Sequence, residues 1–233
     1  MKDEVLAVRD VTKVFEEGRQ RVEVLKGVTM EVAAGEVVAL EGPSGSGKTT
    51  LLSIVGCILT PTAGDVTVAG ASVRGADERK RREVRRLSIG FVFQQYNLFP
   101  ALSALENVEY SLNVRGVGGG RAHEEARRVL DRVGLGDRLH FLPRDPSGGQ
   151  KQRVAIARAI AGSPPVVLAD EPTANLDTAA GGQVLDLFRR LATSEGKGVL
   201  VVTHDPNVRR IADRVVGIRD GKLVNEDAHA TAA

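Results

Sequence analysis

Apolar and β-branched residues alternate with polar ones in short segments of the N-terminal part of the chain. Such segments occur at 5–8, 22–25 and 28–32, separated by glycine and charged residues. Period-two alternation predicts β-strands with one buried face. We therefore expect a small antiparallel sheet, joined by a further strand at 66–68 after a Pro–Gly turn.

Four other apolar runs are continuous, which is typical of strands buried on both faces of a sheet. They are 37–40, 89–93, 165–169 and 199–202, and polar residues follow each run. A terminal hairpin is predicted from Arg214 to Val224, with its turn at Asp220-Gly221. The polar, alanine-rich residues 225–233 are expected to form a frayed tail.

Residues 96–145 show helical periodicity and no strand signals. Ser103 and Glu106 form a capping-box sequence that predicts a helix through about Val114. Glycines at 116–120 should interrupt it, and a second helix is predicted over 124–133. This part of the chain is expected to be a helical insertion in an α/β core.

Residues 77–87 form a dense basic run in which Val84 and Leu87 are spaced three apart. A solvated helix with one apolar edge is the simpler interpretation. A nucleic-acid patch is the alternative, but no aromatic residues are interleaved, and the net charge of the whole chain is only +2. No nucleic-acid partner is expected.

The composition is that of an ordinary globular protein, with 42% hydrophobic and 27% charged residues in a chain of 233. The single cysteine, Cys57, excludes an internal disulfide and a cysteine-based zinc site, and we expect it in the core. The sequence shows no signal-peptide pattern and no apolar stretch of membrane-spanning length. A soluble cytoplasmic protein is therefore expected, with any membrane role exercised through a partner.

A phosphate-binding loop follows the first continuous apolar run. Residues 42–49 fit the pattern G-x-x-x-x-G-K-[ST], between a predicted strand and a predicted helix at 50–55. A strand, a glycine-rich turn and a helix N-terminus direct backbone N–H groups and a positive dipole end at one place, which suits nucleotide phosphate. The candidate contacts are Gly42, Pro43, Ser44, Gly45, Ser46, Gly47, Lys48, Thr49 and Thr50.

Polar residues at the ends of the other continuous runs are further candidates. Gln94 follows the second run, where α/β sheets place ligand contacts, although a surface turn is an equal alternative. Asp170 and Glu171 end the third, where adjacent carboxylates repel each other unless a cation or a proton compensates. One carboxylate can serve Mg²⁺ and its neighbour can act as a general base. His204 stands at the end of the fourth run.

A second helix start carries a hydroxyl and two glycines: Ser147, Gly148, Gly149 and Gln150. Such a start can bind an anion, and a simple N-cap is the alternative. The double glycine favours a binding function, because glycine weakens a purely structural helix start.

Taken together, these motifs resemble those of the ATP-binding cassette (ABC) ATPases, over essentially the whole chain. Residues 42–49 match Walker A, Gln94 the Q-loop, 147–150 the signature and 167–171 Walker B, while Asn175-Leu176-Asp177 match the D-loop and His204 the switch histidine. Residues 24–27 and 54–57 look like the branch that serves lipoprotein release, macrolide export and cell division. Pro146 departs from the leucine that usually opens the signature, which puts in doubt how tightly this helix couples to the insertion.

The resemblance implies an α/β fold: a P-loop NTPase core of RecA-like type with a mostly parallel sheet, an antiparallel β subdomain and an inserted helical subdomain. Residues 1–233 would form a single nucleotide-binding domain. Its parts would be a core of 1–93 and 150–224, a helical subdomain of 95–149 that carries the signature, and a tail of 225–233.

The resemblance also implies the ligands, ATP and Mg²⁺, and the residue roles. Lys48 and the loop amides would hold the β- and γ-phosphates. Thr49 would bind Mg²⁺ with support from Asp170, and Gln94 would sense both the metal and the attacking water. Glu171 would polarise that water, and His204 would touch the γ-phosphate and orient Glu171. Phe15 is a candidate for stacking on adenine, with a buried core phenylalanine as the alternative. When ATP is bound, two copies would form a head-to-tail homodimer in which the signature, residues 147–150, and Asp177 of one copy face the P-loop of the other.

Three functions are compatible with this resemblance. The favoured one is the ATPase subunit of an export or lipoprotein-release transporter, peripheral on the inner face of the membrane and bound to an integral permease. An ABC ATPase that changes the shape of a cell-division-type membrane complex without transport is the alternative. A DNA-repair or chromosome-type ABC ATPase is disfavoured, because the stretch between Thr49 and Ser147 is too short for a long coiled coil and shows no heptads.

Overall fold

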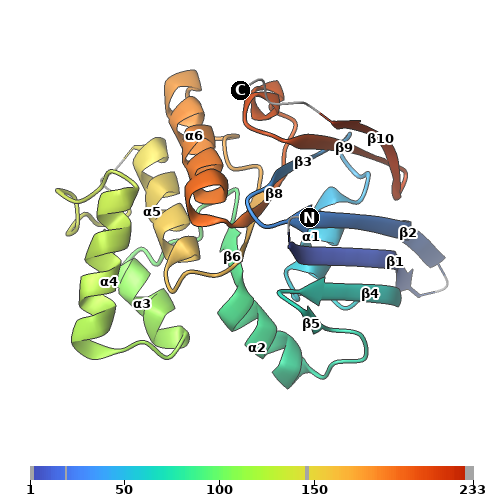
Figure 1. Cartoon of the computed structure of the whole chain (residues 1–233), viewed down its shortest axis with the longest axis horizontal. Coiled ribbons are helices and arrows are strands. Elements are labelled where there is room, and N and C mark those ends of the chain that lie inside the picture. The colour runs from blue at the N-terminus through green and yellow to red at the C-terminus, as the bar shows by residue number, and fades with distance from the viewer. Residues whose placement is uncertain (1–2, 19, 145–146, 229–233) are drawn as a thin grey trace.

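The structure is a computed structural model, and it describes residues 3–18, 20–144 and 147–228. Two sheets and the helices around them are arranged as in Figure 1. The strands are β1 (Glu4–Glu17), β2 (Gln20–Ala33), β3 (Val37–Glu41), β4 (Ala63–Val68), β5 (Ala71–Ser72), β6 (Ile89–Val92), β7 (Val166–Asp170), β8 (Gly198–Val202), β9 (Arg214–Arg219) and β10 (Lys222–Ala228). The helices are α1 (Lys48–Val55), α2 (Glu78–Ser88), α3 (Ala104–Val114), α4 (Gly119–Arg132), α5 (Gly148–Ile160), α6 (Thr178–Glu195) and the 3₁₀ helix η1 (Pro206–Arg210).

The smaller sheet is antiparallel, with strand order β2-β1-β4-β5. The segment at 66–68 joins it as predicted, but the short N-terminal segments are parts of two long strands. Gly27 does not end a strand: it lies inside β2 with φ of +72°. The register passes from Val11↔Val28 to Lys13↔Leu25, so β2 carries an extra residue there. A β-bulge of this kind absorbs a glycine that the sequence pattern presents as a break.

The larger sheet has the order β10-β9-β3-β8-β7-β6. Strands β9, β3, β8, β7 and β6 run parallel to their neighbours, and β10 is antiparallel to β9. The predicted terminal hairpin is confirmed. The prediction of a tail is wrong for residues 225–228, because β10 continues through them and pairs with β9 as far as Ala228↔Arg214, and residues 229–233 lie outside the described part.

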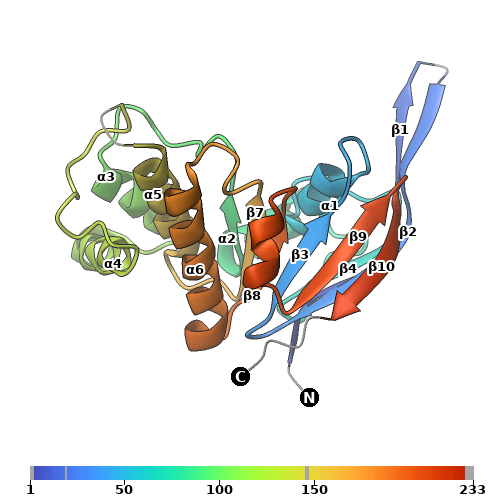
Figure 2. The ribbon, with the colours of Figure 1, turned by 90° about the horizontal axis from the view of Figure 1, so that it is seen from above.

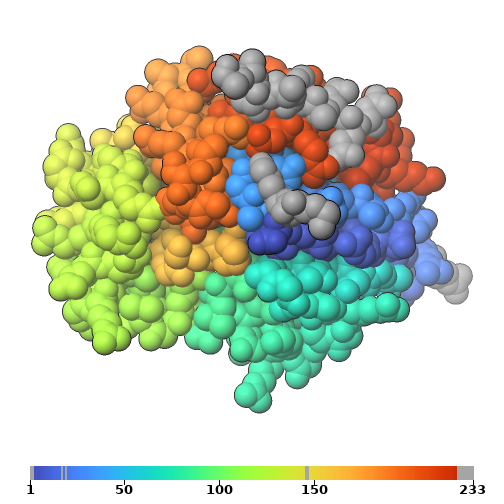
Figure 3. All heavy atoms as spheres, viewed as in Figure 1, coloured from blue at the N-terminus to red at the C-terminus, as the bar shows by residue number. Residues whose placement is uncertain are grey.

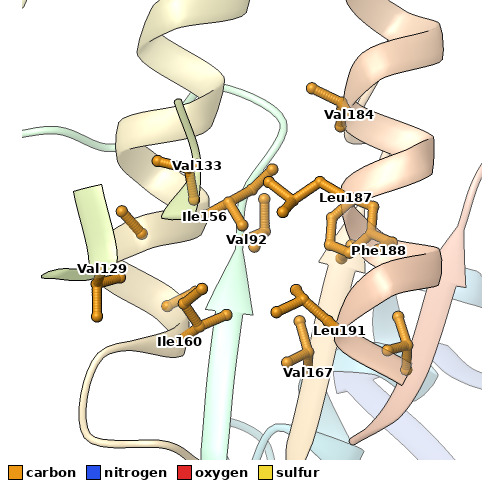
Figure 4. Packing of buried hydrophobic residues seen from close by; sticks show 14 of the residues in the cluster. Val92, Val129, Val133, Ile156, Ile160, Val167, Val184, Leu187, Phe188 and Leu191 are labelled. Carbon is orange, nitrogen blue, oxygen red and sulfur yellow. The ribbon is translucent and has the colours of Figure 1, made fainter. Parts of the chain in front are cut away.

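The larger sheet separates two hydrophobic cores, because its strands alternate their side chains between its two faces. Val37 and Ala39 of β3 pack with α3–α6, whereas Val38 and Leu40 pack with α1 and the smaller sheet. Seen from above, α3–α6 lie on one side of this sheet, and α1, β1 and β2 lie on the other (Figure 2). Figure 4 shows the helical side, where apolar residues of α5 and α6 meet those of β6 and β7. The predicted α/β architecture with an antiparallel sheet is confirmed.

The helical insertion is built mainly from α3 and α4, coloured yellow-green at the left of Figure 3. The capping box of Ser103 and Glu106 is present, and α3 ends at Val114 as predicted. Helix α4 begins at Gly119, inside the predicted glycine break. Its buried face includes Ala122 as well as Ala126, Val129 and Leu130, so the apolar face extends one turn before the predicted start. The predicted boundary between residues 149 and 150 falls inside α5, which packs against α3 and α4 as well as β6 and α6.

The basic run forms α2, capped by the Asp77 side chain. Val84 is buried as predicted, but Leu87 is 45% exposed, so the apolar edge is narrower than the spacing suggests. Cys57 is buried, and this burial raises the pKa of its thiol to about 11. Across the described ranges, no helix combines the length and apolarity needed to cross a bilayer.

Lys197 is a buried cation whose effect on stability should depend on pH. Its side chain is 3% exposed, and Nζ donates to Ser163 Oγ at 3.1 Å and to the Pro164 carbonyl at 2.9 Å. Burial, aided by the positive charges of Arg132 and Arg115, lowers its pKa from 10.5 to about 8. Between these two pH values the unfolded chain binds the proton that the folded chain has lost, so stability should rise with pH.

We expect the free energy of unfolding of the wild type, relative to Lys197→Met, to increase from pH 8 to pH 10.5 by on the order of 3 kcal/mol. Urea unfolding of both proteins at intermediate pH values measures it. A difference that stays constant over this range would show that Lys197 titrates normally in the folded chain.

Candidate phosphate-binding and catalytic site

The glycine-rich loop joins the end of β3 to the start of α1. Gly47 caps α1 in the left-handed region, with φ of +105°, and Gly45 has φ of +79°. A Cβ at Gly42 would collide with the Ile218 carbonyl oxygen, and one at Gly47 would lie 2.8 Å from Leu25 Cδ2. Glycine is therefore required at both ends of the loop, because neighbouring strands approach its backbone closely.

Polar groups in this loop remain available for a ligand. No side chain caps the N-terminus of α1, and its first turn holds no acidic residue. Lys48 Nζ donates to the carbonyls of Gly42 at 2.7 Å and Pro43 at 2.9 Å, so the ammonium lies over the loop. Ser46 Oγ is buried and has no hydrogen-bond partner among the described residues. The loop thus combines a positive helix end, a cation and an unpaired hydroxyl.

The terminal hairpin braces this loop from the other side. The Gly221 N–H donates to the Ser46 carbonyl at 3.2 Å, and the Gly221 carbonyl accepts from the Lys26 N–H at 2.9 Å. A single turn residue therefore links the phosphate-binding loop to both β10 and β2.

The two carboxylates end β7 at the same edge of the sheet. Burial raises the pKa of Asp170, the negative charge of Glu171 raises it further, and the nearby positive charge of Lys48 opposes both effects. Asp170 therefore lies within electrostatic reach of the phosphate-binding loop. Glu171 adopts a left-handed backbone with φ of +45°, and its N–H donates to the Val202 carbonyl at 2.8 Å. Such backbone strain in a non-glycine residue is common at functional sites.

His204 orients the Glu171 carboxylate. Its Nδ1 lies 2.9 Å from Glu171 Oε1, and its backbone N–H donates to Glu171 Oε2 at 3.3 Å. The turn that carries His204 is fixed by Asp205, which accepts from Thr173 Oγ1 at 2.8 Å and from the Asn207 N–H at 2.9 Å. Burial alone would raise the pKa of Asp205, but these hydrogen bonds outweigh it and lower the pKa. The Glu171–His204 pair is therefore held in place before any ligand arrives.

Gln94 follows β6 in an exposed turn. Its carbonyl accepts a hydrogen bond from Asn175 Nδ2 at 3.1 Å, so the turn is attached to the segment that follows β7. After Gln95, the residues Tyr96 and Asn97 have φ of +59° and +49°. The side chain of Gln94 is exposed at the strand end, which agrees with both sequence interpretations, ligand contact and surface turn.

Ser147 caps α5, and Gln150 completes a capping box: the Gln150 N–H donates to Ser147 Oγ at 3.4 Å and the Ser147 N–H to Gln150 Oε1 at 3.0 Å. The glycines have a packing role that the sequence argument left out. A Cβ at Gly148 would lie 3.1 Å from both the Asn175 carbonyl and Tyr96 Oη, and one at Gly149 would lie 3.0 Å from Ala180 Cβ. The double glycine is therefore not by itself a sign of anion binding.

Asp177 and Phe15 have local roles that the sequence did not show. The Asp177 carboxylate caps α6 by accepting from the Ala180 N–H at 2.8 Å. Phe15 is 38% exposed near the end of β1, and Lys13 Nζ lies 4.9 Å from its ring centroid. The alternative of a buried core phenylalanine is wrong. Pro146 lies outside the described residues.

The structure brings some predicted residues together and keeps others apart. The loop 42–49, Asp170, Glu171 and His204 gather where parallel strands of the larger sheet end. The start of α5 instead packs against residues 96 and 175–180. Because α1 and α5 bury their apolar residues in different cores, the two helix starts belong to opposite faces of the sheet.

Arg158 contributes to this arrangement without any signal in the sequence. From α5 it donates to the Tyr96 carbonyl at 2.8 Å and to the Asn97 carbonyl. These partners lie 61 and 62 residues earlier in the chain, so the hydrophobic periodicity of α5 cannot predict the contact.

Comparison with known proteins agrees with this site. The family model described as ABC transporter matches residues 25–174. An uncharacterized ABC transporter ATP-binding protein of Thermotoga maritima is 49% identical over 94% of this chain and 93% of its own length. The lipoprotein-releasing system ATP-binding protein LolD of Shewanella denitrificans is 43% identical over 97% of each chain.

The fold also matches a solved structure. It is the dimeric post-hydrolysis state, bound to ADP and Pi, of the ATP-binding cassette MJ0796 of Methanocaldococcus jannaschii. The TM-score is 0.88 at 41% identity, covering 96% of this chain and 98% of the other. A phosphate-binding loop, a paired glutamate and histidine, and similarity over nearly the full length lead to one assignment: the chain belongs to the ABC transporter family, as one of its ATP-binding and ATP-hydrolysing subunits.

Proposed function

We propose that this ATPase drives a separate integral membrane permease of the export or lipoprotein-release type, and that its residues take the roles given below. The Glu171–His204 contact beside the phosphate-binding loop is the observation that carries the catalytic part, because it presents an oriented carboxylate where a γ-phosphate would lie. The similarity to LolD supports the type of partner.

Residues 42–50 would hold the phosphates of ATP. Lys48 already lies over the loop through the carbonyls of Gly42 and Pro43, and it would exchange these bonds for β- and γ-phosphate oxygens. The N–H groups at the start of α1 supply further donors. The unpaired Ser46 Oγ is a hydroxyl for which a ligand or a water would provide the missing partner.

The residues present fit Mg²⁺. This ion prefers hard oxygen ligands, and Thr49, Asp170 and Gln94 offer a hydroxyl, a carboxylate and an amide oxygen. A bound cation would lower the pKa of Asp170 and so offset the effect of burial, which raises it. When bound, the ion would neutralise charge on the phosphate oxygens.

Glu171 would take the proton of the attacking water. Both of its carboxylate oxygens are within reach of His204, so the carboxylate has a fixed direction. His204 is largely exposed, which leaves the rest of its ring available to a γ-phosphate. A base held in this way needs no rearrangement during the reaction.

We also propose that two copies bind two ATP molecules between them; the MJ0796 cassette bound to ADP and Pi is likewise dimeric. The starts of α1 and α5 belong to opposite faces of the sheet, so a second copy would have to supply Ser147, Gly148, Gly149, Gln150 and Asp177 to a given phosphate-binding loop. The exposed ring of Phe15 is available to stack on adenine.

An apolar groove between α2, β6 and α3 is the proposed docking site of the permease. It has a volume of about 320 Å³, and the aromatic residues in it form two pairs, Phe91 with Phe93 and Phe99 with Tyr110. Tyr110 is 48% exposed and Val114 is 52% exposed. Arg85 and Arg86 add positive charge to the lining, which suits an apolar cytoplasmic segment with acidic ends. Bound there, the chain would be peripheral on the cytoplasmic face of the membrane.

Replacing Tyr110 by alanine is expected to weaken coupling to the permease roughly 30-fold, because exposed aromatic residues in grooves dominate such interfaces. An integral permease of the lipoprotein-release type would be co-expressed with this chain, reconstituted in lipid vesicles, and titrated with wild type or variant while ATP hydrolysis is measured. Basal hydrolysis by the variant alone should be unchanged.

Val22→Ala is the matched control, since Val22 is equally exposed but lies on β2. Failure of the wild type to bind or respond to the membrane protein would refute the proposed partner. Release of cargo from the vesicles would favour a transporter, and ATP-dependent shape change without release would favour the cell-division type of function.

A further inference from the structure

Arg158 is a partly buried charged residue that none of the motifs includes. Its guanidinium forms two hydrogen bonds, to the Tyr96 carbonyl at 2.8 Å and to the Asn97 carbonyl. Its own carbonyl accepts from Ser111 Oγ at 3.0 Å, which joins α5 to α3. The two side-chain bonds end on consecutive residues of the turn that begins at Gln94.

This turn has an unfavourable backbone conformation. Tyr96 and Asn97 are both in the left-handed region, with φ of +59° and +49°. A bulky aromatic residue rarely adopts this region, and asparagine, although it is found there more often than most residues, still adopts it less readily than glycine. Within the turn, Tyr96 N–H donates to the Phe93 carbonyl at 3.1 Å and Asn97 N–H to the Gln95 carbonyl at 2.5 Å. A strained conformation of this kind persists only when surrounding contacts hold it.

The turn contacts two other motif segments of the same chain, at Asn175 and Gly148. Asn175 Nδ2 donates to the Gln94 carbonyl at 3.1 Å, and a Cβ at Gly148 would lie 3.1 Å from Tyr96 Oη. The conformation of residues 94–97 therefore determines both where Gln94 lies and what packs against the start of α5.

We propose that Arg158 is a positioning residue for ATP hydrolysis: its guanidinium holds the strained turn 94–97 and thereby fixes Gln94 at the end of β6. This inference rests on the proposed role of Gln94 at the Mg²⁺ ion. Without the guanidinium the turn relaxes and Gln94 loses its position, while the loop 42–49 still binds nucleotide.

An arginine suits this role because its planar guanidinium offers several N–H donors in a fixed geometry, and two of them reach consecutive carbonyls. A lysine supplies one point charge and cannot fix both. Arg158 and Asn97 also line the apolar groove beside Tyr110, so a segment bound in the groove lies against this contact.

The test uses glycine to remove the strain. Arg158→Met should lower kcat for ATP about tenfold and leave the affinity for ATP within about twofold. Adding Asn97→Gly should restore most of kcat, because glycine adopts the left-handed region without strain and the turn then needs less support. Asn97→Gly alone should hydrolyse ATP like the wild type.

Arg115→Met is the matched control. Arg115 is also a partly buried arginine with two backbone partners, the carbonyls of Leu87 at 3.3 Å and Ile89 at 2.8 Å, but neither partner belongs to the turn. Its replacement should lower stability, and Asn97→Gly should not compensate. If Asn97→Gly also fails to restore Arg158→Met, the role of Arg158 is merely structural and the proposal is overturned.

Hydrogen exchange separates this proposal from the role of Gln94. The amides of residues 94–97 should exchange faster in Arg158→Met and return toward wild-type rates in the double variant. Unchanged exchange in Arg158→Met overturns the contact itself. If exchange behaves as expected but Gln94→Ala hydrolyses ATP normally, Arg158 does fix the turn, and the error lies in the proposed role of Gln94.

Discussion

Replacing Glu171 by glutamine is expected to lower the rate of ATP hydrolysis by about 10²–10⁴-fold while ATP binding persists, because a positioned general base contributes that much and an amide cannot accept the proton. Glutamine keeps the size of the side chain and an oxygen for the His204 contact. With hydrolysis blocked, ATP-bound dimers should accumulate. Phosphate release measures the first effect, and size-exclusion chromatography with Mg-ATP measures the second.

Glu41→Gln is the control for this experiment. Glu41 ends β3, which β8 separates from β7 in the sheet, and its carboxylate is paired with Arg209 at 2.7 and 3.1 Å. Loss of that ion pair should leave hydrolysis near the wild-type rate. A Glu171→Gln protein that hydrolyses ATP normally, or that stays monomeric at every ATP concentration, would contradict the role given to Glu171.

Replacing Lys48 by alanine is expected to abolish useful ATP binding, with a loss of affinity on the order of 100-fold. Charge-assisted hydrogen bonds contribute about 1.5–3 kcal/mol, and the same ammonium also ties the loop together through the carbonyls of Gly42 and Pro43. Titration with a fluorescent ATP analogue measures the affinity.

Lys80→Ala provides a comparison at an exposed lysine of α2, whose ion pair with Glu83 spans 3.4 Å. It should bind the analogue like the wild type, because exposed pairs contribute little. An unchanged affinity in Lys48→Ala would mean that phosphate is bound elsewhere.

The elements that sequence predicts well here are those whose signals are local. The Ser103 and Ser147 capping boxes specify helix starts within four residues, and the positive φ angles of the loop favour glycine at 45 and 47. The strands that end at Asp170 and Val202 are continuous apolar runs, so the edge where the catalytic residues gather could also be predicted.

The features that sequence does not reveal depend on contacts between distant segments. Gly27 is accommodated by a bulge that exists only because β1 pairs with β2. Positions 148 and 149 require glycine because Asn175, Tyr96 and Ala180 leave little room for a Cβ there. Arg158 has an ordinary place in a helix, and its partners are defined only after α5 has packed beside the turn.

The hydrogen bond between Gly221 and Ser46 makes the last turn of the fold part of the triphosphate receptor. Strand β9 also covers β3 on the side opposite β8. A polypeptide shortened before residue 214 would keep every recognised motif and yet leave β3 as an open edge, with the receptor unsupported. Nucleotide affinity is therefore a property of the full-length fold, and motif-bearing fragments are poor substitutes for it.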